Sequence, residues 1–416
     1  MAQTHKSVNE CIFMLDCARK YFTPEWIKRL IDEISAVGYN AINIHFAEDV
    51  AVRLESKKFP WLAGGDHILC SFGEEYGCPE NNGDYITQED MADIVRYAQS
   101  RGLDVIPSLD SPGHMTYAVK KYKERFGIDI GNYFHKNGKT AIVQTMGENG
   151  ETPRVPYSRG IDISNAEAVA FVKELYLEYG TFFRELGCTS FDIGGDELLG
   201  WGDAGSIDKT VPKWCNLDHW EAHARALTGN PKAVAYDAFI LYMNDISALL
   251  RSLGYTSIRM WNDDVYRHSD TMWQEATQLD KDIDVQFWSP HTNGGENTAQ
   301  YYIDRGHNLY NFARPYTYYT LYPIGRNPSY VTPEAIMKEW DPYLFAADNS
   351  ECDPGNSGYI FPPFKEGNRI TAPNEKVKGA GFCLWCDTPG AETQEELLEH
   401  IRPYFTAIAK KTRGNY

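Results

Sequence analysis

Eight short apolar runs recur along the 416-residue chain, and amphipathic segments lie between several of them. This alternation limits the fold more than any other feature, because repeated strand–helix units form a parallel sheet covered by helices. Eight such units in one uninterrupted chain predict a single α/β domain, residues 1–416, folded as a (β/α)8 barrel. The predicted strands are residues 11–16, 41–45, 104–109, 190–193, 258–261, 284–288, 309–312 and 381–385.

Residues typical of helix ends support this reading. The clearest helix follows Thr23, a favourable N-cap residue, has Pro24 in its first turn and ends at Gly38. Further helices are predicted at Gln88–Ser100, at residues 166–186 and at residues 233–253. The apolar positions of the first helix recur at three- and four-residue spacing, at Ile27, Leu30, Ile31 and Ile34.

Composition excludes several classes of partner. The chain carries a net charge of −18, and its Lys and Arg residues are dispersed, so nucleic acid and anionic membrane surfaces are poor partners. No apolar stretch approaches the roughly 18 residues of a membrane span, and the first residues lack an apolar signal region. Nine scattered cysteines suit a reducing compartment. We therefore expect a cytoplasmic protein, or a secreted one if a signal has been trimmed, with no cofactor and no metal.

The active site of such a barrel forms at the C-terminal ends of its strands, so the residues just after each apolar run should carry chemical groups. Charged residues and tryptophans do gather there, which is typical of a sugar-binding pocket. Ordinary polar loops would explain the charges about as well, but they explain the repeated tryptophans poorly. The residues are Asp16, Arg19, His45, Glu48, Asp49, Asp110, His114, Asp196, Glu197, Trp261, Asp263, Asp264, Trp288, Trp385 and Asp387.

The segment from Phe191 to Glu197 reads Phe-Asp-Ile-Gly-Gly-Asp-Glu and is the sharpest motif. Two glycines before two adjacent carboxylates let the backbone approach closely and turn as the strand ends. Cleavage of a glycosidic bond needs one carboxylic acid to protonate the leaving oxygen and a second group to stabilise the oxocarbenium-like centre. Asp196 and Glu197 are therefore the candidate catalytic residues.

This segment resembles the His-x-Gly-Gly-Asp-Glu signature of family 20 glycoside hydrolases, the β-N-acetylhexosaminidases. The likeness extends over most of the chain. Segments 15–22, 43–49 and 108–114 are similar to the family's Asp-x-x-Arg strand end, second-strand motif and Asp-x-Pro-Gly-His motif. Segments 260–263, 286–288 and 384–387 resemble the strand ends that wall the family's pocket with tryptophan.

The resemblance implies substrate-assisted hydrolysis of a terminal β-linked N-acetylhexosamine, in which the 2-acetamido oxygen attacks the anomeric carbon. It implies that Asp196 orients the acetamido N–H and that Glu197 protonates the leaving oxygen. Tyr319 fits the acetamido-binding tyrosine best, with Tyr318 as the fallback. Adjacent carboxylates in a partly dry pocket should also push one pKa upward, which suits Glu197 as the acid. The remaining implied substrate-binding residues are Arg19, His114, Trp261, Trp288, Tyr318, Trp385 and Asp387.

Two positions differ from the family 20 pattern that the chain resembles. Asp192 stands where the signature usually has His, and Asp387 stands where Glu commonly binds a sugar hydroxyl. Both changes bear on specificity. A lacto-N-biosidase, which releases a Gal-GlcNAc disaccharide, is therefore the alternative to an enzyme that releases one sugar. A non-catalytic sugar-binding barrel is the second alternative, although it has no need of Asp196 and Glu197 together.

Other features allow two readings each. His45 and His114 are either core histidines or supports of the site, with His114 expected to bond an acid rather than the sugar. The Cys-x-x-Cys spacing of Cys383 and Cys386 is read as structural, because the two side chains should point to opposite faces of a strand. Residues 263–264 bind a hydroxyl or cap a helix. Residues 147–157 form an ordinary excursion more readily than a lid.

Overall fold

A computed structural model of the protein describes residues 7–65, 84–132, 160–197, 217–262, 276–288, 297–321, 331–345 and 365–414. It also describes the short pieces 135–136, 139–140, 142–143, 155–156 and 265–266. Asp263, Asp264 and most of residues 147–157 lie outside these ranges, so the two readings of each stay predictions.

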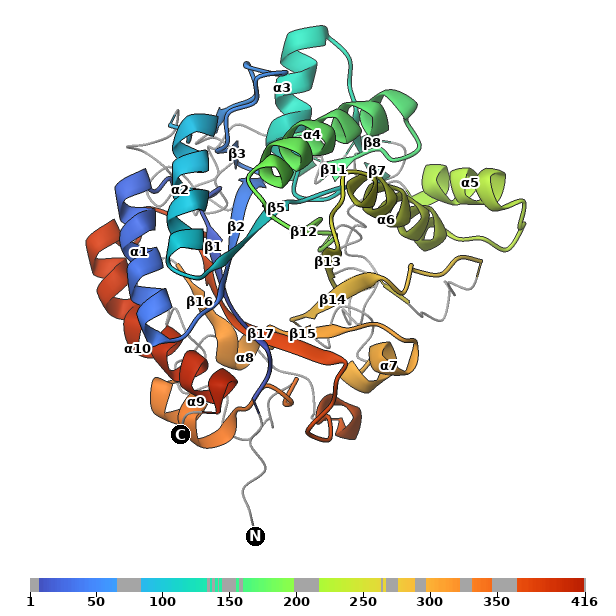
Figure 1. Ribbon diagram of the computed structural model, residues 1–416. Coiled ribbons are helices and arrows are strands. Elements are labelled where there is room, and N and C mark those ends of the chain that lie inside the picture. The colour runs from blue at the N-terminus through green and yellow to red at the C-terminus, as the bar shows by residue number, and fades with distance from the viewer. Residues whose placement is uncertain are drawn as a thin grey trace.

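Parallel strands form a closed barrel at the centre of the molecule (Figure 1). Each strand pairs with the next one, and the last returns to pair with the first, so the barrel has no open edge. The predicted fold class and all eight predicted strands are confirmed. The strands are β1 (Glu10–Asp16), β2 (Ala41–Glu48), β5 (Asp104–Leu109), β12 (Ser190–Asp192), β13 (Ser257–Trp261), β14 (Ile283–Phe287), β15 (Leu309–Asn311) and β17 (Val377–Trp385).

Helices surround the barrel on its outside (Figure 1). They are α1 (Pro24–Val37), α2 (Gln88–Ser100), α3 (Thr116–Phe126), α4 (Ala166–Glu185), α5 (Leu217–Thr228), α6 (Ala235–Ser252), α7 (Ala299–Asp304), α9 (Pro333–Glu339) and α10 (Gln394–Arg413). The predicted cap of α1 is present, since the Thr23 side chain accepts a hydrogen bond from the Trp26 N–H. Gly38 ends the helix in the left-handed region, at φ 106°.

Shorter elements are added to the barrel and its helices. The strand β16 (Tyr318–Thr320) follows the one-turn helix α8 (Arg314–Thr317) and pairs in parallel with the end of β17. Elements this short carry too little periodicity for a sequence prediction. The others are β3 (Ala51–Val52), β4 (Gly64–Gly65), β6 (Gly131–Asn132), β7 (His135–Lys136), β8 (Lys139–Thr140), β9 (Ile142–Val143), β10 (Val155–Pro156), β11 (Gly160–Ile161) and the 3-10 helix η2 (Glu366–Asn368).

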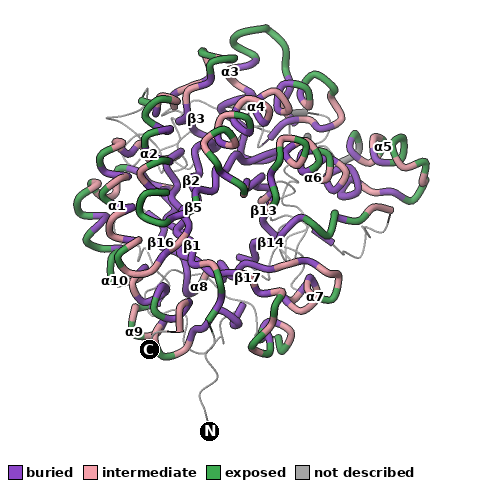
Figure 2. Tube along the Cα trace, viewed as in Figure 1, coloured by how far each residue is buried: buried purple, intermediate pink, exposed green. Residues whose placement is uncertain are grey.

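Buried residues follow the barrel strands, and exposed residues lie mainly on the outward helix faces (Figure 2). The larger apolar cluster packs the helices against the outside of the sheet. A second cluster includes residues of β1, β5, β13, β15 and β17 together with three aromatic residues of the site, Trp288, Tyr318 and Trp385. A barrel interior filled with side chains in this way is a packed core rather than a pore.

Cys383 and Cys386 are buried free thiols, and burial raises the pKa of both well above the ordinary value, which agrees with a structural role. Among the described helices, none is both long and apolar enough to cross a membrane.

Candidate active site

Apart from Tyr318 and Tyr319, which lie on β16, the predicted site residues follow or end barrel strands at the same end of the barrel. Arg19 follows β1, His114 follows β5, and Asp196 and Glu197 follow β12. Trp261 and Trp385 end β13 and β17, Trp288 follows β14, and Asp387 follows β17. The barrel therefore brings together residues that lie as far apart in sequence as 19 and 387, as the fold prediction requires.

The Gly-Gly turn after β12 sets the direction of the two carboxylates. Gly194 and Gly195 both have left-handed backbones, at φ 67° and 88°. A Cβ on Gly194 would lie 1.8 Å from Oδ1 of Asp110, so only glycine fits there. The Gly195 N–H donates to the same Asp110 oxygen at 3.0 Å, and the Gly194 carbonyl accepts from the Trp261 N–H at 2.9 Å. The predicted close approach of the glycine backbone is confirmed.

The carboxylates that follow the turn remain accessible. The side chains of Asp196 and Glu197 are 13% and 23% exposed, in contrast to the buried residues around them. Glu197 itself has φ 49°, an uncommon conformation for a residue other than glycine. His114 shares this feature at φ 50°. Strained backbone of this kind is concentrated at functional sites in proteins.

His114 lies between the acid pair and a second set of carboxylates. Its Nδ1 is 3.0 Å from Oε2 of Glu48 and 3.5 Å from Oδ2 of Asp49. Its Nε2 is 3.6 Å from Oδ2 of Asp196 and 3.7 Å from Oε2 of Glu197. The structure thus places His114 against acids, as the sequence reading expected.

These contacts decide the charge of His114. Burial by itself would lower the pKa of the imidazole, but the carboxylates of Glu48 and Asp196 outweigh that cost and raise the pKa to about 10. His114 is therefore an imidazolium at neutral pH. In return, the pKa of Glu48 is held well below its ordinary value, against the effect of burial, by the positive charges of Arg19 and His114.

Arg19 joins Glu48 to the end of β1. Its guanidinium contacts Oδ2 of Asp16 at 2.8 Å and Oε1 of Glu48 at 2.5 Å. Asp16 also accepts hydrogen bonds from the Arg19 and Cys386 N–H groups, which ties the end of β1 to the loop after β17. Arg19 is thus held from two sides, and its side chain is 14% exposed.

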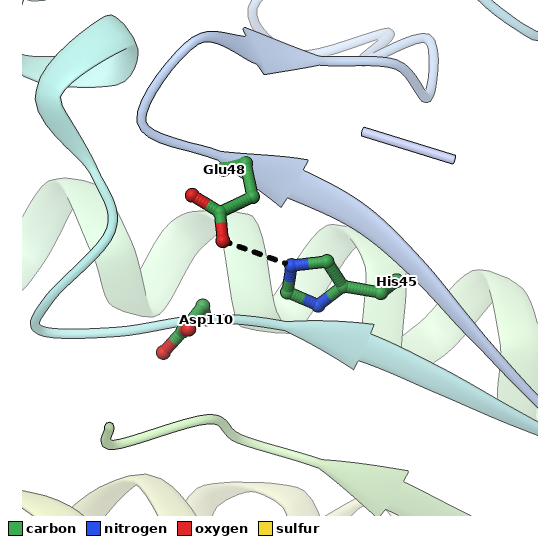
Figure 3. Close-up of side chains that lie close together, drawn as sticks. All are labelled: His45, Glu48 and Asp110. Carbon is green, nitrogen blue, oxygen red and sulfur yellow. Dashed lines mark ion pairs between the residues drawn. The ribbon is translucent and has the colours of Figure 1, made fainter. Parts of the chain in front are cut away.

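Asp110 is a further carboxyl group close to Asp196 of the acid pair. Figure 3 shows Asp110 near His45 and Glu48, with His45 Nε2 3.5 Å from Oε1 of Glu48. His45 also contacts the Ser108 hydroxyl through Nδ1 at 3.0 Å. Burial raises the pKa of Asp110 well above its ordinary value, and the negative charge of Asp196 adds to that rise.

Three overlapping groups of His, Asp and Glu side chains have ligand atoms within 4.8 Å of one another, which is close enough to surround a metal ion. They are His45 with Glu48 and Asp110, Glu48 with Asp49 and His114, and Asp110 with His114 and Asp196. The cations Arg19 and protonated His114 lie among these carboxylates. A metal ion bound to a nitrogen of His114 would first have to displace a proton from it.

Aromatic rings form a contiguous wall beside the acid pair. Trp288 stacks on Tyr318 with ring centroids 6.2 Å apart and planes 13° from parallel. Trp385 lies 6.0 Å from the rings of both Tyr318 and Trp261, and the Arg19 guanidinium lies over Trp385 at 5.4 Å. Flat apolar rings beside a charged cluster are suited to the face and hydroxyls of a sugar.

The two neighbouring tyrosines point in different directions. The Tyr319 hydroxyl donates to Oε1 of Glu392 at 2.9 Å, and its ring packs edge-on against Tyr404 of α10. Tyr318 belongs to the inner aromatic cluster, close enough to Asp196 that its charge contributes to the raised pKa of Tyr318, after burial. Successive side chains on a strand point to opposite faces, so β16 can present only one of the two to the site.

Asp387 lies beside Arg19. Burial raises the pKa of Asp387, the positive charge of Arg19 opposes that rise, and the carboxylates of Asp16, Glu48 and Glu197 add to it. Asp387, Arg19 and Trp385 thus lie together at one side of the site, where the sequence analysis expected sugar hydroxyls to bind.

Sequence reasoning assigned no role to Glu48 and Asp110, although it placed both at the rim. Their roles depend on the adjacency of β2 to β5 and of β5 to β12, which brings Glu48 to His114 and Asp110 to Gly195. The sequence shows only that each carboxylate comes directly after an apolar run, which places it at the rim. It does not show that Glu48 contacts His114 or that Asp110 contacts Gly195.

Comparisons with known proteins identify the family of the chain. The profile of the glycosyl hydrolase family 20 catalytic domain matches residues 12–412. A β-hexosaminidase of Vibrio vulnificus is 23% identical over 420 residues, which is 95% of this chain and 46% of that protein. The N,N'-diacetylchitobiase of Vibrio harveyi is 22% identical over 96% of this chain and 48% of its own length. A lacto-N-biosidase of Bifidobacterium bifidum is 23% identical over 79% of this chain and 23% of its own.

Solved structures share the fold. The crystal structure of Dispersin B aligns with a TM-score of 0.63 at 22% identity, covering 97% of this chain and 99% of that one. The exo β-N-acetylglucosaminidase of Vibrio harveyi aligns with a TM-score of 0.64 at 19% identity, covering 98% of this chain and 54% of that one. The chain spans less than half the length of the curated relatives described above. Because the profile matches nearly the whole sequence, the chain belongs to glycosyl hydrolase family 20.

Proposed function

We propose that this protein is a retaining exo-β-N-acetylhexosaminidase, which releases terminal β-linked GlcNAc or GalNAc from oligosaccharides or glycans by substrate-assisted catalysis. The observation that carries the proposal is the accessible pair Asp196 and Glu197, raised on the Gly-Gly turn beside Tyr318 and the tryptophans. A binding protein would need the aromatic wall but not two acids on a strained turn. Relatives named β-hexosaminidase and diacetylchitobiase support this choice.

In the first step, the acetamido oxygen of the substrate attacks the anomeric carbon while Glu197 gives its proton to the leaving glycosidic oxygen. Asp196 accepts a hydrogen bond from the acetamido N–H and stabilises the positive charge of the oxazolinium ring that forms. The Tyr318 hydroxyl donates to the acetamido oxygen, the role expected for Tyr319 from the sequence alone. In the second step, Glu197 takes a proton from water, which opens the ring and retains the anomeric configuration.

The cations around the pair support this chemistry. Imidazolium His114 lies within 3.7 Å of both Asp196 and Glu197, so it stabilises the carboxylate that Glu197 becomes after giving up its proton. Glu48 keeps His114 charged and is itself paired with Arg19. Arg19 and Asp387 bind the outer hydroxyls of the terminal sugar, and Trp385 packs against its ring.

Two aryl substrates test the proposal. The enzyme should hydrolyse an aryl N-acetyl-β-glucosaminide and should act far more slowly on the matched β-glucoside, which lacks the acetamido nucleophile. Equal activity on both would mean that the acetamido group is not the nucleophile. Binding of N-acetylglucosamine with no turnover of either substrate would instead favour the non-catalytic sugar-binding barrel.

Release of a single sugar is favoured over release of a disaccharide because Arg19, Trp385 and Asp387 crowd the end of the site that holds the outer hydroxyls. The lacto-N-biosidase alternative needs space there for a galactose, and the shorter Asp at 387 provides about one methylene of it. Product analysis on lacto-N-tetraose separates the two. A monosaccharide-releasing enzyme leaves this tetrasaccharide intact, whereas free lacto-N-biose would establish the disaccharide-releasing activity.

A further inference from the structure

Asp192 is a fully buried carboxyl group without an assigned role. It is the last residue of β12 and lies two residues before Gly194 of the turn. The family 20 signature has His at this position. Moving a carboxylate out of water is costly unless hydrogen bonds replace its hydration. The partners of Asp192 therefore indicate what this residue holds in place.

Asp192 connects the turn to β2, two strands away around the barrel. Its Oδ1 accepts a hydrogen bond from the Gly194 N–H at 3.1 Å, and its Oδ2 accepts one from Nδ2 of Asn43 at 2.8 Å. Asn43 lies on β2, and β5 separates β2 from β12 in the sheet. The Asn43–Asp192 contact thus crosses the interior rather than following the ladder between neighbouring strands.

Three hydrogen bonds with known partners fix the turn. Asp192 holds the Gly194 N–H, Asp110 holds the Gly195 N–H, and the Trp261 N–H holds the Gly194 carbonyl. Two consecutive glycines have more accessible backbone conformations than any other pair of residues. Without such anchors, the direction in which the chain leaves the turn would be poorly defined, and the two carboxylates that follow it would be displaced.

We infer that Asp192 is a positioning residue, which aims Asp196 and Glu197 by accepting the Gly194 N–H while Asn43 holds its other oxygen. This inference rests on the proposed function for its kinetic consequences but not for its structural ones. The required property is a hydrogen-bond acceptor at this point, so an amide can replace the carboxylate. Asn43 can turn its own amide to suit, because its Oδ1 is buried without a hydrogen-bond partner.

A pair of substitutions separates this role from simple packing. Asp192→Leu removes the acceptor and should lower kcat by about 10²-fold, the usual cost of displacing a catalytic group by about 1 Å. KM should change less than kcat, since Arg19 and Trp385 are untouched. Asp192→Asn keeps an acceptor and should stay within about threefold of the wild type. If Asp192→Leu does not fold, Asp192→Ala takes its place in the same comparison.

Asp284 provides the matched control. It is also a nearly buried carboxyl group on a barrel strand, and it also accepts two hydrogen bonds, from the Ser257 hydroxyl and the Asn308 amide, both at 2.8 Å. It lies near the N-terminal end of β14, far from the acid pair along the barrel. Asp284→Leu should lower the melting temperature as Asp192→Leu does, while kcat stays at the wild-type value.

Two results would overturn the inference. One is a kcat for folded Asp192→Leu, or its Ala replacement, within threefold of the wild type. The other is a crystal structure of that variant in which residues 194–197 have not moved. The crystal structure needs no turnover, so it decides the positioning role even if the wild type proves inactive on hexosaminides, which would refute the proposed function alone.

Discussion

The two ends of the barrel both bury charged groups, but they balance them differently. At the N-terminal end, Arg259 contacts Oε2 of Glu10 at 2.7 Å and lies over the Tyr310 ring at 4.1 Å, while the Tyr310 hydroxyl donates to the other Glu10 oxygen. In the described residues, the nearby Asp284 has no salt bridge. Its two oxygens instead accept hydrogen bonds from two neutral donors, the Ser257 hydroxyl and the Asn308 amide. Each carboxylate there has donors matched to its oxygens.

At the C-terminal end, carboxylates outnumber the cations. Seven carboxyl groups, Asp16, Glu48, Asp49, Asp110, Asp196, Glu197 and Asp387, surround Arg19 and the imidazolium of His114. The excess shows in the raised pKa of Asp110 and of Asp387, each caused first by burial and then increased by neighbouring negative charge. Buried charge alone therefore does not identify a functional site. A functional site is indicated by a cluster in which carboxylates outnumber cations, located at the C-terminal strand ends where barrels carry their active sites.

The largest expected effect comes from removing the proposed acid at the unbalanced end. Glu197→Gln should lose the general-acid contribution, about 10²–10⁴-fold in kcat/KM for a substrate with a poor leaving group. The loss should be smaller for an aryl substrate whose leaving group needs little protonation. A series of aryl N-acetylglucosaminides with different leaving groups measures this. If both kinds of substrate slow equally, another group is the acid.

The next largest effect distinguishes the two tyrosines of β16. Tyr318→Phe removes the proposed donor that orients the attacking acetamido oxygen and should lower kcat by about 10²-fold, the usual cost of displacing a reacting group by about 1 Å. Tyr319→Phe is the matched control and should lose only the hydrogen bond to Glu392. A large loss in kcat for Tyr319→Phe, with little for Tyr318→Phe, would reverse the assignment.

Disrupting the balanced end should affect stability alone. Arg259→Met leaves Glu10 without its cation and should lower the free energy of unfolding by about 2 kcal/mol, less than for a fully buried pair because Glu10 is 32% exposed. Chemical denaturation measures the loss. The kcat/KM of the folded variant should equal that of the wild type, and a parallel loss of activity would show that the two ends are coupled.

The remaining effect is a dependence of stability on pH that originates from His114. Its pKa is about 10 in the folded protein, against an ordinary value of 6.5, so its stabilising contribution is complete below pH 6.5. That contribution should be lost as the pH rises from 6.5 toward 10. The free energy of unfolding of the wild type should fall over this range more steeply than that of His114→Gln. Parallel curves would mean that His114 is not held as an imidazolium.

The sequence was sufficient to predict the barrel, because each strand and most helices carry their own periodicity and end signals. Thr23 and Gly38 bound α1 where the pattern placed them, and α2 matches residues 88–100 throughout. The Gly-Gly-Asp-Glu turn was predictable for the same reason, since its glycines and acids are contiguous. Such local patterns can be read from the sequence, although Asp110 and Trp261 from other parts of the barrel anchor the turn itself.

Contacts between strands could not be predicted in the same way. The choice of Tyr318 over Tyr319 depends on which face of the three-residue strand β16 turns inward, and so short a strand has no readable alternation. The roles of Glu48 and Asp110 depend on neighbours from other strands. Asp192 departs from the family signature, but its partner Asn43 lies on β2, which is not adjacent to β12 in the sheet.

The central claim is that the cluster at the C-terminal end cleaves glycosides through the acetamido group of the substrate. It is tested most directly by comparing kcat/KM for aryl glycosides whose N-acetyl group carries none, one, two or three fluorines. Fluorine withdraws electrons from the acetamido oxygen, so the account predicts a steep fall in kcat/KM with each added fluorine. Rates that do not change along this series would show that the oxygen does not attack, and would contradict the proposed mechanism.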